Sequence, residues 1–316
     1  MINIFITGGT GLIGSTLIYK LLASKQYSIT ILTRNITKAT RKFGNNVKYC
    51  TSLDSLKNLD DYIAVVNLAG EPMTRKHWSD KQKDKLNKSR WEITRKLAKL
   101  ITSGKNPPNI FISGSAIGFY GAHKDDILTE SSYPHDEFTF RLCSKWEALA
   151  LSAASAKTRV CILRTGIVLS DKGGMLPLIT VPFRIGFGNS IGNGKQYLSW
   201  IHITDMIDGI IFLLNLPEAK GVFNFTSPNP VTNKRFSRIL ARTLFRPCIF
   251  RIPNFLVKLA LGEAATMITD GQRVMPQHLQ DIHFQFSFER LDDALNDILL
   301  KKSAIPHNTN VLHHTE

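Results

Sequence analysis

The sequence has few cysteines and no long apolar segment. The cysteines form no Cys-x-x-Cys pattern; they are Cys50, Cys143, Cys161 and Cys248. This predicts free thiols in a reducing compartment. No uninterrupted apolar run is long enough to cross a bilayer, and the first residues form a strand-like run instead of a charged-then-apolar export signal. We therefore expect a cytoplasmic protein with no membrane partner.

Carboxylates are scarce relative to cations. The chain of 316 residues has 25 Asp and Glu against 40 Lys and Arg, a formal net charge of +15. Such a charge can favour the binding of nucleic acid, of an anionic membrane or of an anionic ligand. The cations are scattered, with a modest concentration in 75–105, and a compositional bias of the genome toward Asn and Lys would also produce them. Without a recognised nucleic-acid motif, we expect no nucleic-acid partner.

Metal-binding clusters are also missing. Residues 302–316 are polar and carry three histidines, His307, His313 and His314, but not the ligand set of a metal site. The segment predicts a loose tail, and we predict no metal. Hydrophobic residues make up 43% of the chain, enough for one large domain or a domain with a substantial lobe.

A glycine-rich turn near the start organises the chain. An apolar run over 4–7 predicts a strand, and apolar residues at helical spacing over 15–23 predict a helix. Between them, Gly8, Gly11 and Gly14 stand three residues apart, as in a dinucleotide-binding turn. The turn would place a pyrophosphate at the helix N-terminus. The predicted contacts are Gly8, Thr10, Gly11, Leu12, Ile13 and Gly14.

The end of the second predicted strand, 27–34, bears on the choice of nucleotide. An acidic residue roughly 20 positions past the turn would hold the ribose 2′-hydroxyl of NAD. This chain has Thr33 and Arg34 there. Because a guanidinium is a planar partner for phosphate, Arg34 predicts NADP(H), with Asn35 and Lys38 as further candidates.

The later strands predict a parallel sheet. Apolar runs over 62–70, 109–115 and 160–169 alternate with helical patterns over 79–102 and 138–156. Near-continuous apolar strands of this kind are typical of a parallel sheet covered on both faces. Small residues at a strand end leave room for a cofactor, so we predict that Asn67, Leu68, Ala69 and Gly70 lie beside it. After about residue 170 the chain is rich in glycine and then mostly helical.

Several motifs together resemble the extended short-chain dehydrogenase/reductases of the NAD-dependent epimerase/dehydratase superfamily. They are Thr7 to Gly14, Asn67 to Gly70, Ser113 to Ala116 with Tyr120-Gly121, and Trp200 to Asp205. Further motifs are similar to one atypical branch, the "epimerase family proteins" with a C-terminal domain of undefined function. Those are Ser89-Arg90, Cys143 with Trp146-Glu147, Arg164 to Leu169, Gly173 to Met175 and Gly271 to Pro276.

The resemblance implies a doubly wound α/β Rossmann fold that binds NADP(H), with a smaller, mostly helical C-terminal substrate lobe. We assign 1–170 to the Rossmann domain, with sheet segments returning at about 198–226. Residues 171–301 form the substrate lobe, and 302–316 the tail.

The catalytic pair of the superfamily is missing. The resemblance implies a Ser and a Tyr-x-x-x-Lys pair, in which the Tyr is the general acid or base. Here the matching helix offers Arg141 with Lys145 or, in another register, Cys143 with Glu147. Three candidates remain for catalytic positions. They are Ser115, with Ser113 as its alternative, Tyr120, and Lys145 as a ribose ligand.

Two functions stay open on the sequence. One is an NADP(H)-dependent oxidoreductase or epimerase-like enzyme that acts on a small hydroxyl or carbonyl substrate. The other is a non-catalytic NADP(H)-binding or redox-sensing protein that acts through a partner. A homodimer is compatible with either function.

Overall fold

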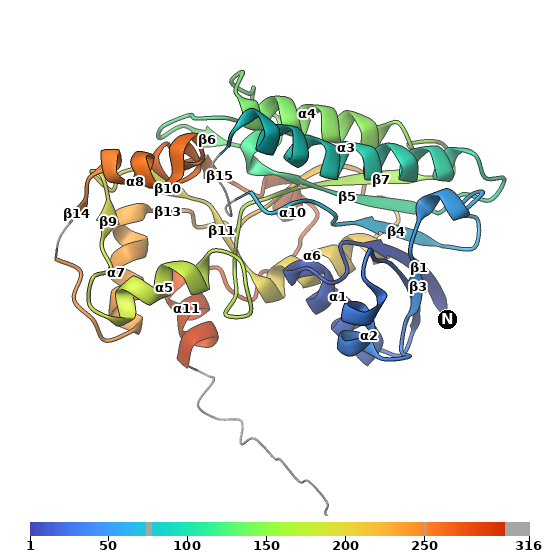
Figure 1. Ribbon diagram of the computed structural model, residues 1–316, viewed down its shortest axis with the longest axis horizontal. Coiled ribbons are helices and arrows are strands. Elements are labelled where there is room, and N and C mark those ends of the chain that lie inside the picture. Colours follow the sequence, from blue (N-terminus) through green and yellow to red (C-terminus); the bar gives the residue numbers. More distant parts are fainter. Residues whose placement is uncertain (74–77, 250, 301–316) are drawn as a thin grey trace, which may run out of the picture.

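A seven-stranded parallel sheet forms the centre of the computed structural model, which describes residues 1–73, 78–249 and 251–300 (Figure 1). The predicted tail, 302–316, lies outside the described residues. The strand order is β12-β7-β5-β4-β1-β2-β3. The strands are β1 (Ile2–Thr7), β2 (Tyr27–Leu32), β3 (Lys48–Cys50), β4 (Ala64–Asn67), β5 (Ile110–Ala116), β7 (Arg159–Thr165) and β12 (Gly221–Phe225). Each neighbouring pair is parallel, so the predicted fold class is confirmed.

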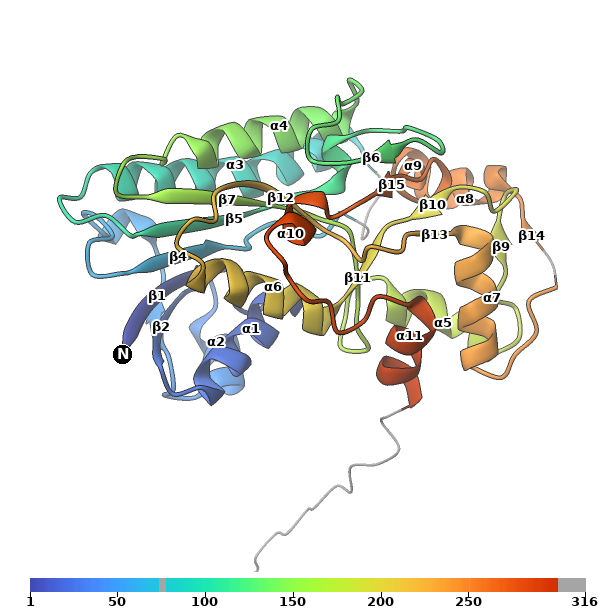
Figure 2. The ribbon, with the colours of Figure 1, turned by 180° about the vertical axis from the view of Figure 1, so that it is seen from behind.

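Helices cover both faces of this sheet (Figures 1 and 2). On one face lie α1 (Leu12–Ala23), α2 (Ile36–Phe43) and α6 (Ile203–Asn215), and on the other α3 (Asp80–Thr102) and α4 (Phe138–Leu151). Because successive strand residues point to opposite faces, Ile4 and Ile6 pack in one core cluster and Phe5 in the other. The apolar strands therefore supply both layers.

A mostly helical lobe follows the sheet, as predicted. Its helices are α5 (Leu176–Arg184), α7 (Asn233–Thr243), α8 (Asn254–Leu261), α9 (Thr266–Thr269), α10 (Gln277–Asp281) and α11 (Leu291–Leu300). They alternate with two- or three-residue strands, β8 (Ile167–Leu169), β9 (Ser190–Ile191), β10 (Tyr197–Leu198), β11 (Trp200–His202), β13 (Val231–Thr232), β14 (Arg251–Ile252) and β15 (Arg273–Val274), which pairs with β6 (Ile127–Leu128). A separate apolar cluster includes Trp200, Phe236 and Leu295.

The strand segments expected at about 198–226 are only partly in the main sheet. β12 is its outermost strand beside β7, whereas β11 pairs with β8 outside it. The short 3-10 turns are Leu53–Ser55, Ile117–Phe119 and Gly262–Ala265. No helix in the described part of the chain is long and apolar enough to span a membrane.

Candidate active site

The glycine turn after β1 is so tight that it leaves no room for a side chain at Gly8 or Gly14. Gly8 has φ +69°, and a Cβ there would lie 2.3 Å from the carbonyl oxygen of Leu68. A Cβ on Gly14 would lie 2.4 Å from the carbonyl oxygen of Gly8. The backbone N–H of Gly11 donates to that same Gly8 oxygen at 3.0 Å. Only glycine therefore fits at the first and third positions of the motif.

The turn opens the N-terminus of α1. Gly11 is the exposed N-cap residue, no side chain caps the helix, and its first turn contains no acidic residue. The first backbone N–H groups of such a helix lack partners inside the helix and favour an anion. Thr10, Leu12 and Ile13 are half-buried around this opening. The backbone therefore fits the pyrophosphate of a dinucleotide.

Cations gather beside this helix end. Arg34 is exposed just after β2, and the Lys42 ammonium on α2 lies 3.5 Å from the carbonyl oxygen of Thr10. Burial, and then the charges of Lys38 and Lys172, lowers the pKa of Lys42. Such a group of lysines suits an additional phosphate.

Sequence reasoning missed Lys42 and Lys172. Lys38 and Lys42 are four residues apart on a predicted helix, a spacing that indicates a shared face. Lys172 carries no such signal. Its loop reaches the site through tertiary structure, since a Cβ on the neighbouring Gly174 would lie 3.3 Å from the side chain of Leu12. The Asn35 side chain is partly used within the protein, where it accepts the N–H of Lys38 as the N-cap of α2.

The end of β4 lies beside the turn, but the Asn67 side chain does not face a cofactor. Asn67 is fully buried. Its amide accepts from the hydroxyl of Thr7 at 2.6 Å and donates to Thr94 at 2.8 Å and to Ser113 at 3.3 Å. These bonds join β1, β4, α3 and β5. Asn67 can therefore contribute to a nucleotide site only through its backbone.

The other residues after β4 differ in what they present. Leu68 is half-buried, Ala69 is buried, and Gly70 is exposed. A Cβ on Gly70 would lie 3.0 Å from the guanidinium carbon of Arg90, which is itself buried. The guanidinium donates to the carbonyl oxygens of Leu86 and Glu71 and lies over the Trp146 ring, 5.3 Å from its centroid. The end of β4 therefore lies beside Arg90 and Trp146, which line the cavity that forms the second region of the site.

A cavity of about 230 Å³ lies past the carboxyl ends of β5 and β7. Ser115, Cys143, Trp146 and Arg90 line it, and Gln272 closes it from the C-terminal lobe. The Gln272 amide donates to the carbonyl oxygen of Gly121 at 2.7 Å, which ties the lobe to the cavity wall.

A buried polar network supports this cavity. The hydroxyl of Ser115 donates to Glu147 at 2.6 Å, and Glu147 receives Arg164 through two hydrogen bonds of 3.0 and 2.9 Å. Burial alone would lower the pKa of Arg164, but the hydrogen bonds and charge of Glu147 outweigh it and raise that pKa. Arg164 also donates to the phenol of Tyr120 at 3.1 Å.

Tyr120 belongs to this network and not to the cavity surface. It is fully buried, and its hydroxyl donates to the side chain of Asn224 at 2.7 Å. Burial raises the pKa of Tyr120 to about 12, although Arg164 opposes the shift. A phenol that is enclosed in this way has no access to a substrate. This placement argues against Tyr120 as a catalytic acid.

Lys145 also lies elsewhere than predicted. It is exposed on α4, with its ammonium 4.3 Å from the centroid of the Trp91 ring. The face of α4 that meets the cavity carries Cys143, Trp146 and Glu147. Because residues three and four apart share a helix face, Lys145 cannot lie on the face of Cys143 and Glu147. This placement argues against Lys145 as a ribose ligand, whereas Ser115 lines the cavity.

Comparison with known proteins identifies the family. The model of the NAD-dependent epimerase/dehydratase family matches residues 4–225, and that of DUF1731, a domain of unknown function, matches 252–298. The chain belongs to the NAD-dependent epimerase/dehydratase family.

Three relatives align with nearly the whole of this family member. The epimerase family protein SSP1921 of Staphylococcus saprophyticus is 35% identical over 95% of this chain and 100% of its own. An Arabidopsis thaliana protein, "Epimerase family protein SDR39U1 homolog, chloroplastic", is 33% identical over 94% of this chain and 86% of its own. The crystal structure of human SDR39U1 with NADPH has a TM-score of 0.85 at 30% identity and covers 94% and 99% of the two chains.

One of the two registers open for Tyr-x-x-x-Lys in this epimerase/dehydratase family member places Cys143 and Glu147 at its positions. Both are buried, and Cys143 borders the cavity. Burial and the charge of Glu147 raise the pKa of the Cys143 thiol to about 12. The thiol is therefore protonated at neutral pH and is not a nucleophile. Of the two pairs that the sequence offers on α4, Cys143 and Glu147 are buried, whereas Arg141 and Lys145 are exposed.

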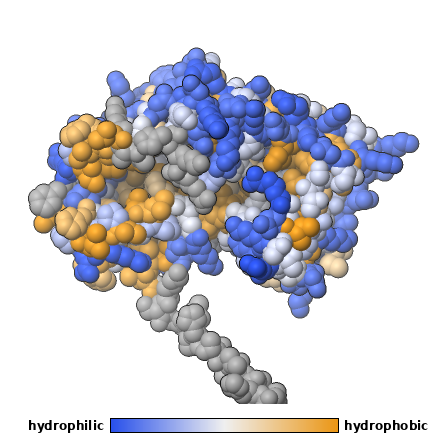
Figure 3. Space-filling model, in the orientation of Figure 1, coloured by the Kyte–Doolittle hydropathy of each residue, from blue (hydrophilic) through white to orange (hydrophobic). Residues whose placement is uncertain are grey.

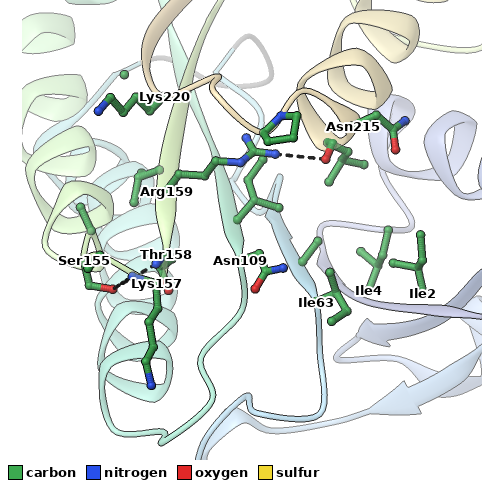
Figure 4. Close-up of a pocket in the computed structure, with 18 of the residues that line it drawn as sticks. Ile2, Ile4, Ile63, Asn109, Ser155, Lys157, Thr158, Arg159, Asn215 and Lys220 are labelled. Carbon is green, nitrogen blue, oxygen red and sulfur yellow. Dashed lines mark hydrogen bonds between the residues drawn. The ribbon is translucent and has the colours of Figure 1, made fainter.

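A second hollow of this family member lies at the opposite edge of the sheet (Figure 4). It measures about 940 Å³ and is lined by strand amino ends, including Ile4, Asn109 and Arg159. Arg159 donates to the carbonyl oxygens of Leu213, Leu214 and Ala219, so its charge is already engaged. Ligands of open parallel sheets bind at strand carboxyl ends, and this hollow does not belong to the candidate site.

The described residues contain no group of three or more His, Cys, Asp or Glu side chains placed to hold a metal ion. His202, named in the sequence motif Trp200 to Asp205, caps α6 by accepting the N–H of Thr204 and stacks on Phe288. Asp205 accepts the N–H groups of Ser287 and Phe288. This motif joins the two lobes.

Proposed function

We propose that the chain binds NADP(H) and is an oxidoreductase or epimerase-like enzyme for a small hydroxyl or carbonyl compound. The observation that carries the proposal is the closed glycine turn at an uncapped helix end with Lys42 beside it. No acidic residue occurs between Leu32 and Phe43 to favour the 2′-hydroxyl of NAD. The human relative whose structure was determined with NADPH supports the same cofactor.

We assign the residues to three places: the pyrophosphate of the cofactor, its 2′-phosphate, and the path toward the substrate cavity. The backbone from Gly8 to Gly14 would hold the pyrophosphate, and Arg34 with Lys42 would hold the 2′-phosphate. Leu68, Ala69 and Gly70 would line the path toward the cavity. When bound, the nicotinamide supplies the redox chemistry by taking up or releasing two electrons and a proton.

The substrate would bind in the cavity beside Ser115. The hydroxyl of Ser115 can orient a substrate oxygen, and its position is fixed by Glu147. The cavity volume of about 230 Å³ favours a small substrate. We place the nucleotide in 1–170, and assign 171–301 to the substrate lobe because Gln272 and its neighbours close the cavity.

The absence of disulfides supports a cytoplasmic location for this activity. The four cysteines are free thiols, two of them buried. We expect a small-molecule substrate and no nucleic-acid partner, and a homodimer is the assembly to test first.

A second candidate function is a non-catalytic NADP(H)-binding or redox-sensing protein. It is favoured by the replacement of the phenol and ammonium of the usual pair by Cys143 and Glu147. The thiol does not ionise near neutral pH, and the carboxylate is held by Arg164 in two hydrogen bonds. Such a protein would bind NADPH without turning over any alcohol or ketone.

Fluorescence titration with NADPH and NADH tests the cofactor. We expect the wild type to prefer NADPH, and Arg34→Ala and Lys42→Ala to reduce this preference. Arg95→Ala, which removes an exposed arginine on α3, is the charge-matched control and should leave it unchanged. Equal binding of both nucleotides by the wild type would overturn the assignment of Arg34.

Substrate turnover separates the two candidate functions. A panel of small alcohols and ketones is followed through NADPH absorbance, with Ser115→Ala as the comparison. Turnover that Ser115→Ala reduces supports the enzyme. NADPH binding without turnover on the whole panel favours the non-catalytic protein.

A further inference from the structure

In contrast to the expectation from the sequence that the protein has no membrane partner, we propose that the outer end of the C-terminal lobe binds anionic lipid bilayers peripherally. This surface consists of exposed apolar residues of α5, α8 and the loops beside them, together with the arginines of α7. We call it the distal face. The proposal is independent of the cofactor, because the distal face does not include the glycine turn or the cavity.

Apolar side chains gather on the distal face to an unusual degree. Nine of the eighteen exposed large hydrophobic residues of the described chain occur within 178–187 and 245–259. They are Leu178, Val181, Ile185, Phe187, Phe245, Ile249, Phe255, Leu256 and Leu259. Figure 3 shows apolar surface over the end of the molecule where Figure 1 places α8, β9, β14 and α7. An exposed apolar patch of this kind indicates an interaction surface.

The apolar residues lie in helical rows that face away from the core. On α5 and its C-terminal cap, Leu178, Val181 and Ile185 are 60–67% exposed and occupy positions i, i+3 and i+7. On α8, Phe255 and Leu259 are four residues apart and 66% and 78% exposed. Rows with this spacing normally face a protein core. Here they project outward, as in helices that lie in a membrane interface.

The two stretches lie at the same end of the lobe. The Arg246 guanidinium, which follows α7, donates to the carbonyl oxygen of Arg184 at the end of α5 at 2.8 Å. The strands β9 and β14 pair, and the N–H of Gly192 donates to the carbonyl oxygen of Ile252 at 2.7 Å. These contacts place the end of α5, the loop after α7 and the strand before α8 together at one end of the lobe.

The distal face carries an excess of positive charge. Residues 219–262 contain no Asp or Glu, and neither do 172–204. Arg235, Arg238 and Arg242 are exposed on α7 at positions i, i+3 and i+7, and they line a groove with Arg290 and Asp292. Cations beside exposed apolar side chains are the combination that peripheral proteins use on anionic lipid.

Nearby carboxylates offset this positive charge only in part. Asp292 and Asp293 contact Arg290 at 3.6 and 3.8 Å, and Glu263 pairs with Lys83. A symmetric dimer through the distal face would bring the arginines of the two copies together, while Asp292 and Asp293 already contact Arg290. The excess of positive charge thus favours an anionic bilayer over a second copy of this chain.

Cosedimentation with vesicles tests the proposal on the full-length protein. The vesicles are phosphatidylcholine alone, or phosphatidylcholine with about one third phosphatidylglycerol, at low salt and at about 0.5 M salt. We expect binding only to the anionic vesicles at low salt. No binding to them at low salt would overturn the proposal.

Two triple variants and their matched controls separate the contributions. Arg235→Gln/Arg238→Gln/Arg242→Gln should weaken binding by roughly tenfold or more, since each lysine or arginine near the surface adds to the attraction. Val181→Ser/Phe187→Ser/Leu259→Ser should weaken it similarly. The controls are Lys81→Gln/Arg95→Gln/Lys99→Gln on α3 for charge and Ile63→Ser/Tyr133→Ser/Leu151→Ser for exposed apolar area.

Several outcomes would contradict the proposed binding to a lipid bilayer. If the α3 control lost as much binding as the α7 variant, net charge alone would account for it. If polyglutamate bound as tightly as vesicles and the serine variant changed nothing, the distal face would be a site for acidic protein. If light scattering showed a dimer that the serine variant dissociates, with no vesicle binding, the face would be a self-association surface. Thermal unfolding by circular dichroism confirms that each variant is folded.

Discussion

The Ser115 hydroxyl donates a 2.6 Å hydrogen bond to Glu147, a residue four positions after Cys143 on α4. In the register that places Cys143 at the tyrosine position, a carboxylate therefore stands where the family resemblance implies a lysine. Glu147 in turn holds Arg164 through both of its oxygens. The arrangement fixes the serine hydroxyl at the cavity wall. The buried ion pair of Glu147 and Arg164 lies behind this hydroxyl.

Replacing Glu147 by Gln should destabilise the protein strongly. Both Glu147 and Arg164 are buried, and removal of one partner leaves the other charge uncompensated, a cost of about 3–5 kcal/mol. Urea unfolding followed by circular dichroism measures it. The matched control is Asp136→Asn, which breaks an exposed pair with Arg141 and should cost little. Equal, small effects of the two variants would contradict the structural role of Glu147.

Tyr120→Phe should lower stability without affecting NADPH binding. The phenol bonds to Asn224 and Arg164 inside the protein, and leaving these buried groups unpartnered costs about 1–3 kcal/mol. The control is Tyr133→Phe, since Tyr133 is 88% exposed and the change should be neutral. If Tyr120→Phe kept full stability but abolished turnover of a substrate, the catalytic role would be restored.

Most of the fold could be predicted from local patterns. The run from Ile4 to Gly14 specifies strand, turn and helix by itself, and the apolar strands indicate a parallel sheet. Boundaries were less predictable. The helix expected over 138–156 ends at Leu151 because the chain must turn back toward β7, with the N–H of Ser155 bonded to the carbonyl oxygen of Thr158. Helix propensity in an alanine-rich segment contains no information on such a turn.

The candidate site was predictable only where backbone chemistry decides it. Glycines signal a close approach of backbone, but a side chain's direction depends on packing. Leu142, Cys143, Trp146 and Glu147 lie on the buried face of α4, and their spacing could have shown that Lys145 faces outward. Lys172 had no signal in the sequence, because a loop from the second lobe brings it to the site.

Gly14→Ala should abolish tight nucleotide binding. Alanine in place of glycine inside a helix normally stabilises it by about 0.5–1 kcal/mol. Here the new Cβ would lie 2.4 Å from the Gly8 oxygen, so the turn must shift. We expect NADPH affinity to fall by roughly tenfold or more, equivalent to about 1.4 kcal/mol. Gly173→Ala is the control, since its Cβ would meet only Leu12, at 3.7 Å. Unchanged affinity in Gly14→Ala would argue against nucleotide binding at this turn.

Cys143 should resist alkylation in the folded protein. Burial and the charge of Glu147 raise its pKa to about 12, whereas Cys50 and Cys248 are partly exposed. Since only the thiolate reacts, iodoacetamide at mildly alkaline pH should label Cys143 at least about 100-fold more slowly than Cys248. Peptide mass spectrometry measures the rates, and labelling in urea, where every cysteine reacts, is the control. Rapid labelling of Cys143 would indicate a thiol activated for chemistry.

The preference for NADPH should weaken as the pH rises above neutral. Burial, with the charges of Lys38 and Lys172, lowers the pKa of Lys42 in the free protein, and a phosphate beside it would raise that pKa. Between these two values binding takes up a proton, so affinity falls as the pH rises through the lowered pKa. The free energy of unfolding should rise with pH over the same range, because Lys42 in the unfolded chain keeps its proton to a higher pH than in the folded protein.

Dissociation constants for NADPH and NADH over a pH series check this prediction. Lys42→Arg should flatten the pH dependence of the NADPH constant, because a guanidinium stays charged throughout. Lys48→Arg, at an exposed lysine on β3, should behave as the wild type. NADH affinity should change little, since it carries no 2′-phosphate. A similar alkaline fall in Lys42→Arg and the wild type would show that another group binds the phosphate, and would move the search to the remaining cations near Thr10.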